Sequence, residues 1–169
     1  MIEMKIRGLT LDPLTNMPII ILKDSEGKHA LPIWVGIFEA NAIALEMENI
    51  STQRPMTHDL IKNILNEVKA KVSHIVIDDL KDNTFYAKIS IKANGAETNV
   101  DSRPSDAIAL ALRLKVPVYV EEKVVEEAKS IDLTGKSIDL TDQSSLEDSS
   151  KWKEWLKNLK PEDFGKYKM

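Results

Sequence analysis

The sequence contains no cysteine among its 169 residues. This absence excludes a disulfide framework, a thiolate zinc site and a cysteine nucleophile, so carboxylates, hydroxyls and three histidines remain for chemistry. It also favours the reducing cytoplasm as the location. No apolar run approaches the roughly 18 residues of a membrane span, and the first six residues alternate in polarity rather than forming a signal-peptide core. We therefore expect a soluble protein without a membrane partner.

An excess of positive charge is also missing. The formal net charge is −4 and the pI is about 5.5, whereas general polyanion binders carry a clearly basic face. Any contact with nucleic acid must therefore be local. The sequence also lacks a glycine-rich phosphate loop, a nucleophile elbow and a zinc helix with paired histidines.

Hydrophobic residues make up 43% of the chain, enough to bury one sizeable core. We predict one main domain over residues 1–129 and a C-terminal arm over residues 130–169. Periodicity and turn residues predict the elements of the domain. The expected strands span residues 2–6, 17–23, 29–35, 72–80, 85–92, 97–101 and 117–120, and the expected helices span residues 36–50, 57–68, 105–113 and 121–129.

These elements form a repeated order of three strands and two helices, with an Arg-Pro pair before a helix in each copy. The order predicts an α+β fold built by internal duplication. The two units are expected to form one curled, barrel-like mixed sheet with the helices packed on it.

The C-terminal arm has a different character. Residues 130–134 are repeated as 137–141 around Gly135-Lys136, which predicts a small hairpin over residues 130–141. This pairing sets Asp132 opposite Asp139, either around a cation or simply in an arm lying on the body. After a linker, residues 151–160 form an amphipathic helix of tryptophans and lysines. The helix could bind nucleic acid or dock on the body or on a neighbouring subunit.

The stretch from Val100 to Arg113 organises the rest of the chain. Arg103-Pro104 turns an extended segment, and an almost wholly apolar helix follows. Ser105 fits the N-cap position, and Asp106 suits the positive end of the helix dipole. The same order recurs at residues 54–60, where Arg-Pro precedes a hydroxyl residue and an aspartate. Two such polar helix starts suggest one shared site.

Four segments resemble the bifunctional nuclease family, and the similarity covers about residues 1–130. They are residues 31–36 (LPIWVG) with Glu39 and Ala40, residues 54–60 (RPMTHDL), residues 82–87 (DNTFYA) and residues 101–111 (DSRPSDAIALA). Residues 161–169 are also similar to bacterial members. The resemblance implies an α+β domain with duplicated strand and helix units, found in bacteria and plants. In plant members the domain is associated with cleavage of both DNA and RNA.

Phosphodiester hydrolysis needs an activated water and stabilisation of the charge that develops on the phosphorus. His58 is the best candidate for a general base, because it stands at a helix start where we expect solvent access. His29 and His74 lie on strands and are more typical of structural histidines. The acidic candidates for the catalytic site are Glu39, Asp59, Asp101 and Asp106, although Asp59 and Asp106 could simply favour helix starts.

The candidates for substrate binding are Arg54, Thr57, Arg103 and Ser105. The two arginines could clamp a phosphate, or instead tie the two turns to nearby carboxylates and carbonyls. Asp101 and Asp106 lie five residues apart across a turn and could converge on a divalent metal such as Mg²⁺ or Mn²⁺. Their spacing matches no recognised metal motif.

The sequence thus favours a cytoplasmic nuclease of low specificity acting on DNA, RNA or both. One alternative is a non-catalytic, oligomeric binding or regulatory module, with a dimer as the favoured homo-oligomer. A further alternative is a protein that binds a small anion at the two helix starts.

Overall fold

The computed structural model describes residues 1–129 and Glu154. All the elements expected in residues 1–129 are present. The hairpin, linker and helix expected in the arm lie outside the described residues, apart from Glu154, whose backbone is helical. The elements are β1 (Ile2–Leu11), β2 (Pro18–Asp24), β3 (Ala30–Trp34), α1 (Ile37–Met47), α2 (Thr57–Glu67), β4 (Lys71–Lys81), β5 (Thr84–Ala93), β6 (Ala96–Ser102), α3 (Pro104–Leu114), β7 (Val118–Val120) and α4 (Glu122–Lys129).

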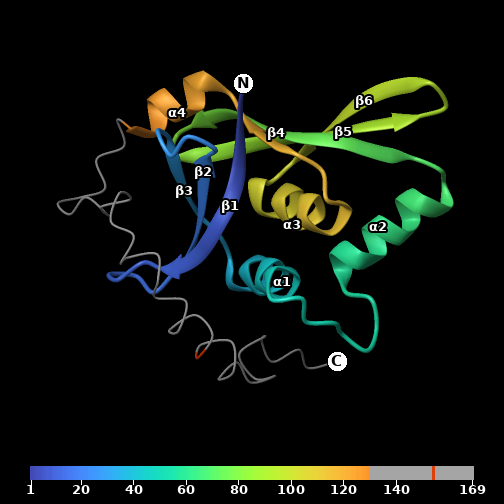
Figure 1. The fold of residues 1–169 in the computed structure, drawn as a ribbon, viewed down its shortest axis with the longest axis horizontal. Coiled ribbons are helices and arrows are strands. Elements are labelled where there is room, and N and C mark those ends of the chain that lie inside the picture. The colour runs from blue at the N-terminus through green and yellow to red at the C-terminus, as the bar shows by residue number, and fades with distance from the viewer. Residues whose placement is uncertain (130–153, 155–169) are drawn as a thin grey trace.

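The strands form one seven-stranded sheet in the order β3-β2-β1-β7-β4-β5-β6. Each half is an antiparallel meander of three strands, and β7 joins the halves by pairing antiparallel with β1 and parallel with β4. Two helices follow each meander in the chain, with β7 inserted between the second pair. This arrangement confirms the expected α+β fold of duplicated units. The sheet is curled but not closed into a barrel, since β3 and β6 are edge strands (Figure 1).

Two tight turns set the register of the second meander. Asp82 and Asn83 have φ angles of 48° and 58°, and Asn94 and Gly95 have φ angles of 51° and 79°. Two-residue hairpin loops of this kind need positive φ at both positions, which aspartate, asparagine and glycine tolerate best. The residues of these two turns therefore place β4, β5 and β6 side by side.

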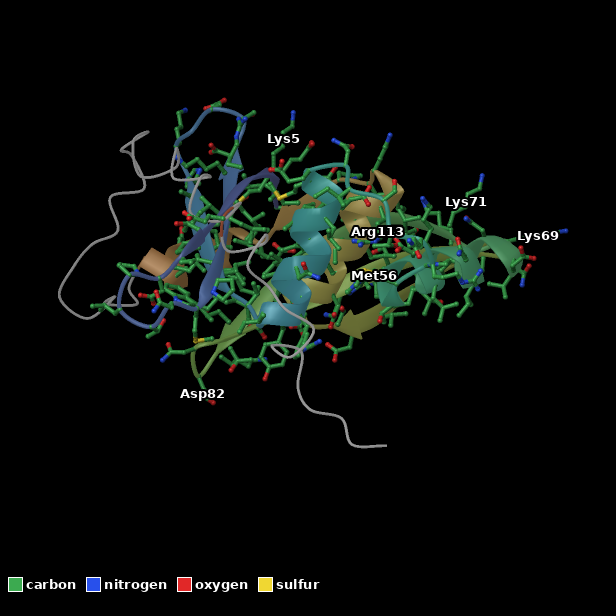
Figure 2. All side chains as sticks on the ribbon, turned by 90° about the horizontal axis from the view of Figure 1, so that it is seen from below. Lys5, Met56, Lys69, Lys71, Asp82 and Arg113 are labelled. Atoms are coloured by element: carbon green, nitrogen blue, oxygen red, sulfur yellow. The ribbon has the colours of Figure 1, made fainter. Side chains whose placement is uncertain are left out.

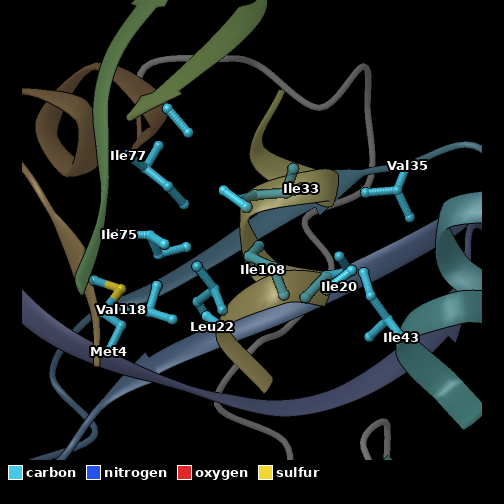
Figure 3. Packing of buried hydrophobic residues seen from close by; sticks show 14 of the residues in the cluster. Met4, Ile20, Leu22, Ile33, Val35, Ile43, Ile75, Ile77, Ile108 and Val118 are labelled. Carbon is cyan, nitrogen blue, oxygen red and sulfur yellow. The ribbon is translucent and has the colours of Figure 1, made fainter. Parts of the chain in front are cut away.

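The core surrounds α3, which lies with α1 on the inner side of the curled sheet (Figure 1). Residues 107–111 of α3 are almost fully buried, and three of them are alanines that allow the sheet to come close. Figure 3 shows Ile108 of α3 in one cluster with Ile20 and Leu22 of β2 and with Ile75 and Ile77 of β4. Residues from both halves thus share one core.

Helix α2 is packed much less completely. His58 is its only buried residue. Leu60, Ile61, Ile64 and the following Val68 keep 38–61% of their surface exposed. They recur at helical spacing, so they form one apolar stripe along α2.

Within residues 1–129, no helix combines the length and apolar character needed to cross a membrane.

Candidate active site

The two polar helix starts meet, as expected from their repetition. Helix α3 begins at Pro104, with Arg103 at the N-cap. The expectation that Ser105 is the N-cap is therefore wrong. Proline is favoured at the first helical position because its φ is already helical and it has no N–H to leave unpaired. Ser105 consequently becomes the second residue of the helix.

His58 of α2 contacts Asp106 of α3, with 3.1 Å between Nε2 and Oδ1. The two residues are 48 positions apart in the sequence. His58 is only 7% exposed, which contradicts the expected solvent access. The reason is that His58 lies on the side of α2 that packs against α3, whereas the exposed stripe occupies a different side of the helix.

Arg103 joins this pair to a second carboxylate. Its Nε lies 2.8 Å from Asp106 Oδ2, and a terminal nitrogen lies 2.6 Å from Glu39 Oε1. The Arg103 side chain nevertheless remains 66% exposed. The hydrogen bond to Asp106, with support from Glu39, raises the pKa of Arg103, so this guanidinium stays charged. One network thus spans α1, α2 and α3 and presents the charged guanidinium of Arg103 at its surface. Its members are His58, Asp106, Arg103 and Glu39.

Glu39 owes its position to a glycine. It belongs to the first turn of α1, and its carboxylate folds back against Gly36, the N-cap residue. A Cβ atom at position 36 would collide with Glu39 Oε2. Gly36 has an ordinary φ of −68°, so its small size rather than its backbone freedom matters here.

Asp59 turns away from the His58–Asp106 pair. Its Oδ2 accepts the backbone N–H of Met56 at 2.9 Å, and its Oδ1 lies 2.7 Å from Arg113 Nε. Burial alone would raise the pKa of Asp59, but the hydrogen bonds from Met56 and Arg113 outweigh it and the pKa is lowered. Asp59 therefore anchors the start of α2 rather than joining the network.

The remaining candidates lie apart from the network. Asp101 is exposed on β6 opposite Lys88, and its charge contributes to the raised pKa of that lysine. Arg54 and Thr57 are also exposed. Among the described residues Arg54 has no carboxylate within 4 Å, so it does not tie its turn as Arg103 does.

Sequence reasoning missed the role of Arg113. This arginine is buried at the end of α3, where it binds Asp59 and donates at 3.0 Å to the carbonyls of Ala109 and Ala42. Arg113 lies close to Met56 at the start of α2 (Figure 2). The sequence shows only that Arg113 follows Asp106 by seven residues and so shares its helix face. Its pairing with Asp59 depends on how α2 packs against α3.

The other histidines have local partners, as expected. The ring of His29 lies 2.8 Å from Asp24 across a turn, and His74 contacts Ser73 and Ser90.

The described residues contain no group of three or more histidine and acidic side chains that could hold a metal ion. Of the two candidate ligands, Asp106 is bound to His58 and Arg103, and Asp101 faces Lys88. This donor set does not fit a divalent metal.

A cavity of about 260 Å³ opens beside Arg103. The β3–α1 junction, the β4–β5 turn and the start of α3 enclose it. Its lining residues are Ile33, Trp34, Val35, Gly36, Asn83, Thr84, Phe85, Arg103, Pro104 and Ser105.

The model of the bifunctional nuclease domain matches residues 20–132, which include the whole network and the cavity. The chain belongs to the bifunctional nuclease family. It is 36% identical over 162 residues to an uncharacterized protein of Mycobacterium tuberculosis, covering 96% of this chain and 97% of that protein.

Plant proteins share the bifunctional nuclease domain at lower identity. Bifunctional nuclease 1 of Arabidopsis thaliana is 28% identical over 109 residues, covering 62% of this chain and 34% of the plant protein. Bifunctional nuclease 2 of Oryza sativa subsp. japonica is 25% identical over 122 residues, covering 70% of this chain and 38% of that protein. This chain thus matches about a third of each plant bifunctional nuclease.

Proposed function

We propose that this protein is a cytoplasmic nuclease of low sequence specificity that hydrolyses phosphodiester bonds of DNA, RNA or both. The observation that carries the proposal is the His58–Asp106 pair, which lies beside the exposed guanidinium of Arg103. Membership of the bifunctional nuclease family supports the class of reaction.

Asp106 prepares His58 for general-base chemistry. A carboxylate accepts the proton on Nε2 and so fixes the tautomer in which Nδ1 carries the free lone pair. No residue in the described part of the chain hydrogen-bonds to Nδ1. We infer that Nδ1 takes a proton from one attacking water, which has to reach His58 through the 7% of its surface that stays exposed.

Arg103 supplies charge stabilisation at the same place. Two of its nitrogens bind Asp106 and Glu39, which hold the guanidinium in place while the side chain as a whole stays 66% exposed. The water oxygen forms a bond to phosphorus, the bond to the leaving oxygen breaks, and solvent protonates that oxygen. Arg103 stabilises the negative charge on the phosphoryl oxygens throughout this step.

Cleavage assays with His58→Ala and Asp106→Asn variants test the proposal. Protein purified free of contaminating nucleases is incubated with single- and double-stranded DNA and RNA in Mg²⁺, Mn²⁺ or EDTA. We expect cleavage by the parent and a rate lower by roughly 10²–10⁴-fold in both variants, because His58→Ala removes the general base and Asp106→Asn removes the carboxylate that fixes its tautomer.

A His74→Gln variant is the matched control, because His74 lies on β4 with serine partners of its own. Absence of cleavage in every buffer would reject the nuclease function. Equal activity of the parent and the His58 and Asp106 variants would reject this site but not the class.

The exposed apolar stripe on α2 favours a second candidate function, that of a non-catalytic binding module that works as a homodimer. Patches of this kind usually mark interaction surfaces. In that case Arg103 and the network around it only hold the three helices together, and the His58 and Asp106 variants would change stability without any activity to lose.

A further inference from the structure

The cavity beside Arg103 combines two kinds of wall. Trp34 at the end of β3 and Phe85 on β5 contribute aromatic surface, and Asn83 in the turn contributes a side-chain amide. Aromatic faces stack on nucleobases of any sequence, while an amide can pair with a base edge. The composition of this cavity therefore suits a heterocyclic base.

Trp34 is held in a fixed orientation. Its Nε1 donates a hydrogen bond to Asp12 Oδ2 at 3.0 Å. This hydrogen bond is the main reason why the pKa of Asp12 is lowered, so the acceptor stays ionised at neutral pH. An aromatic ring that is already oriented loses little conformational freedom when a base stacks on it.

The cavity also has a place for a phosphate at its rim. Ser105 is only 6% exposed and lines the cavity, and its hydroxyl has no hydrogen-bond partner among the described residues. Its own N–H and that of Asp106 belong to the first turn of the eleven-residue helix α3, where no intrahelical acceptor exists. Together with Arg103, these donors match the oxygens of a phosphate.

We propose that this cavity binds one nucleotide unit of a single-stranded nucleic acid. The base lies against Trp34 and Phe85, and its phosphate lies at Arg103 and Ser105. A base in a duplex is stacked and paired, whereas an unpaired base can enter a cavity of this size. The assignment rests on the proposed nuclease function and adds a preference for single strands.

Binding of a fluorescently labelled single-stranded oligonucleotide tests the assignment. The full chain carries His58→Ala, so that cleavage is suppressed. Phe85→Leu retains an apolar side chain but removes the aromatic face. We expect it to weaken binding by about tenfold, the equivalent of about 1.4 kcal/mol.

Tyr86→Leu is the matched control. Tyr86 neighbours Phe85 on β5 but points to the opposite face of the sheet and is 41% exposed. We expect this variant to bind like the parent. An oligonucleotide of the same length with abasic sugars should bind the parent about tenfold more weakly, with no further loss on Phe85→Leu.

Asn83→Gly provides a second variant if Phe85→Leu proves unfolded by circular dichroism. Glycine tolerates the positive φ of position 83, so the turn is kept while the amide is lost. We expect binding to weaken several-fold. Equal affinities of the parent, Phe85→Leu and Asn83→Gly would overturn the cavity assignment and leave the nuclease proposal intact. Failure of the cleavage assay with every substrate would reject the nuclease proposal itself.

Discussion

At the scale of single residues, the contact between Gly36 and Glu39 affects where the positive charge of Arg103 is held. Glu39 can reach Arg103 because no side chain occupies position 36. Arg103 would otherwise depend on Asp106 alone, and a long exposed side chain with a single partner samples many rotamers. The glycine therefore contributes to the orientation of the guanidinium.

We predict that Gly36→Ala displaces Glu39 and lowers nuclease activity by roughly ten- to a hundredfold, the range expected for misplacement of a catalytic group. Stability should change by less than about 1 kcal/mol, because the lost ion pair involves an exposed arginine. Initial rates and thermal melts measure the two effects. Gly8→Ala is the control, since a Cβ at position 8 meets nothing within 4 Å. A Gly36→Ala variant as active as the Gly8→Ala variant would contradict this role.

At the scale of secondary-structure elements, α2 depends on polar contacts more than the other helices do. Its exposed stripe leaves it few buried apolar groups, and Asp59 and His58 attach it to α3. Arg113 completes the attachment by binding Asp59 while it donates to a carbonyl of α1. One buried guanidinium therefore connects three helices.

We predict that Asp59→Asn destabilises the protein by about 3 kcal/mol, because it leaves the Arg113 charge buried without its partner. Chemical denaturation measures the loss. A Lys62→Gln variant is the control, since it removes a charge from the same helix without breaking a short ion pair.

The Asp59→Asn variant should also alter the response of the protein's stability to acid. The pKa of Asp59 is lower in the folded protein than its ordinary value near 3.8. Its contribution is therefore present above that value and is lost as the pH falls through the lower folded pKa. Asp59→Asn should flatten this acid loss of stability. An unchanged acid profile would show that Asp59 is not held by Arg113 in solution.

The elements were predictable because their causes are local. Alternating apolar residues and the pairs Asp82-Asn83 and Asn94-Gly95 define the second meander without reference to the rest of the fold. The meeting of His58 with Asp106 followed from the repeated Arg-Pro starts. The burial of His58 and the role of Arg113 did not follow, because both depend on which side of α2 faces α3. That orientation is a property of packing rather than of local sequence.

At the scale of the whole molecule, the exposed stripe of α2 bears on assembly. Leu60, Ile61, Ile64 and Val68 present aliphatic surface that the described part of the chain leaves uncovered. A second copy could cover this stripe by placing its own α2 alongside, since an isologous contact needs only one patch that matches itself. A homodimer through α2 is thus our expectation for the assembled state.

We predict that the parent has about twice the 19.0 kDa mass of one chain in solution and that Ile64→Lys reduces it to one chain. A buried lysine in the middle of an apolar contact carries a large desolvation cost. Size-exclusion chromatography with light scattering measures the masses. Asn63→Lys adds the same charge at a neighbouring exposed position outside the stripe and should remain dimeric. A monomeric parent, or a dimeric Ile64→Lys variant, would contradict the expectation.

The two edge strands, β3 and β6, affect whether copies of this protein associate through their sheets at high concentration. Strand β3 contains Pro32, which removes one donor from the edge, and β6 carries Glu97 and Asp101 among exposed residues. A sheet that is open at both ends would otherwise be a template for the addition of further strands and for fibril growth. Edge-to-edge polymerisation is thus disfavoured at both ends of the sheet that the described residues form.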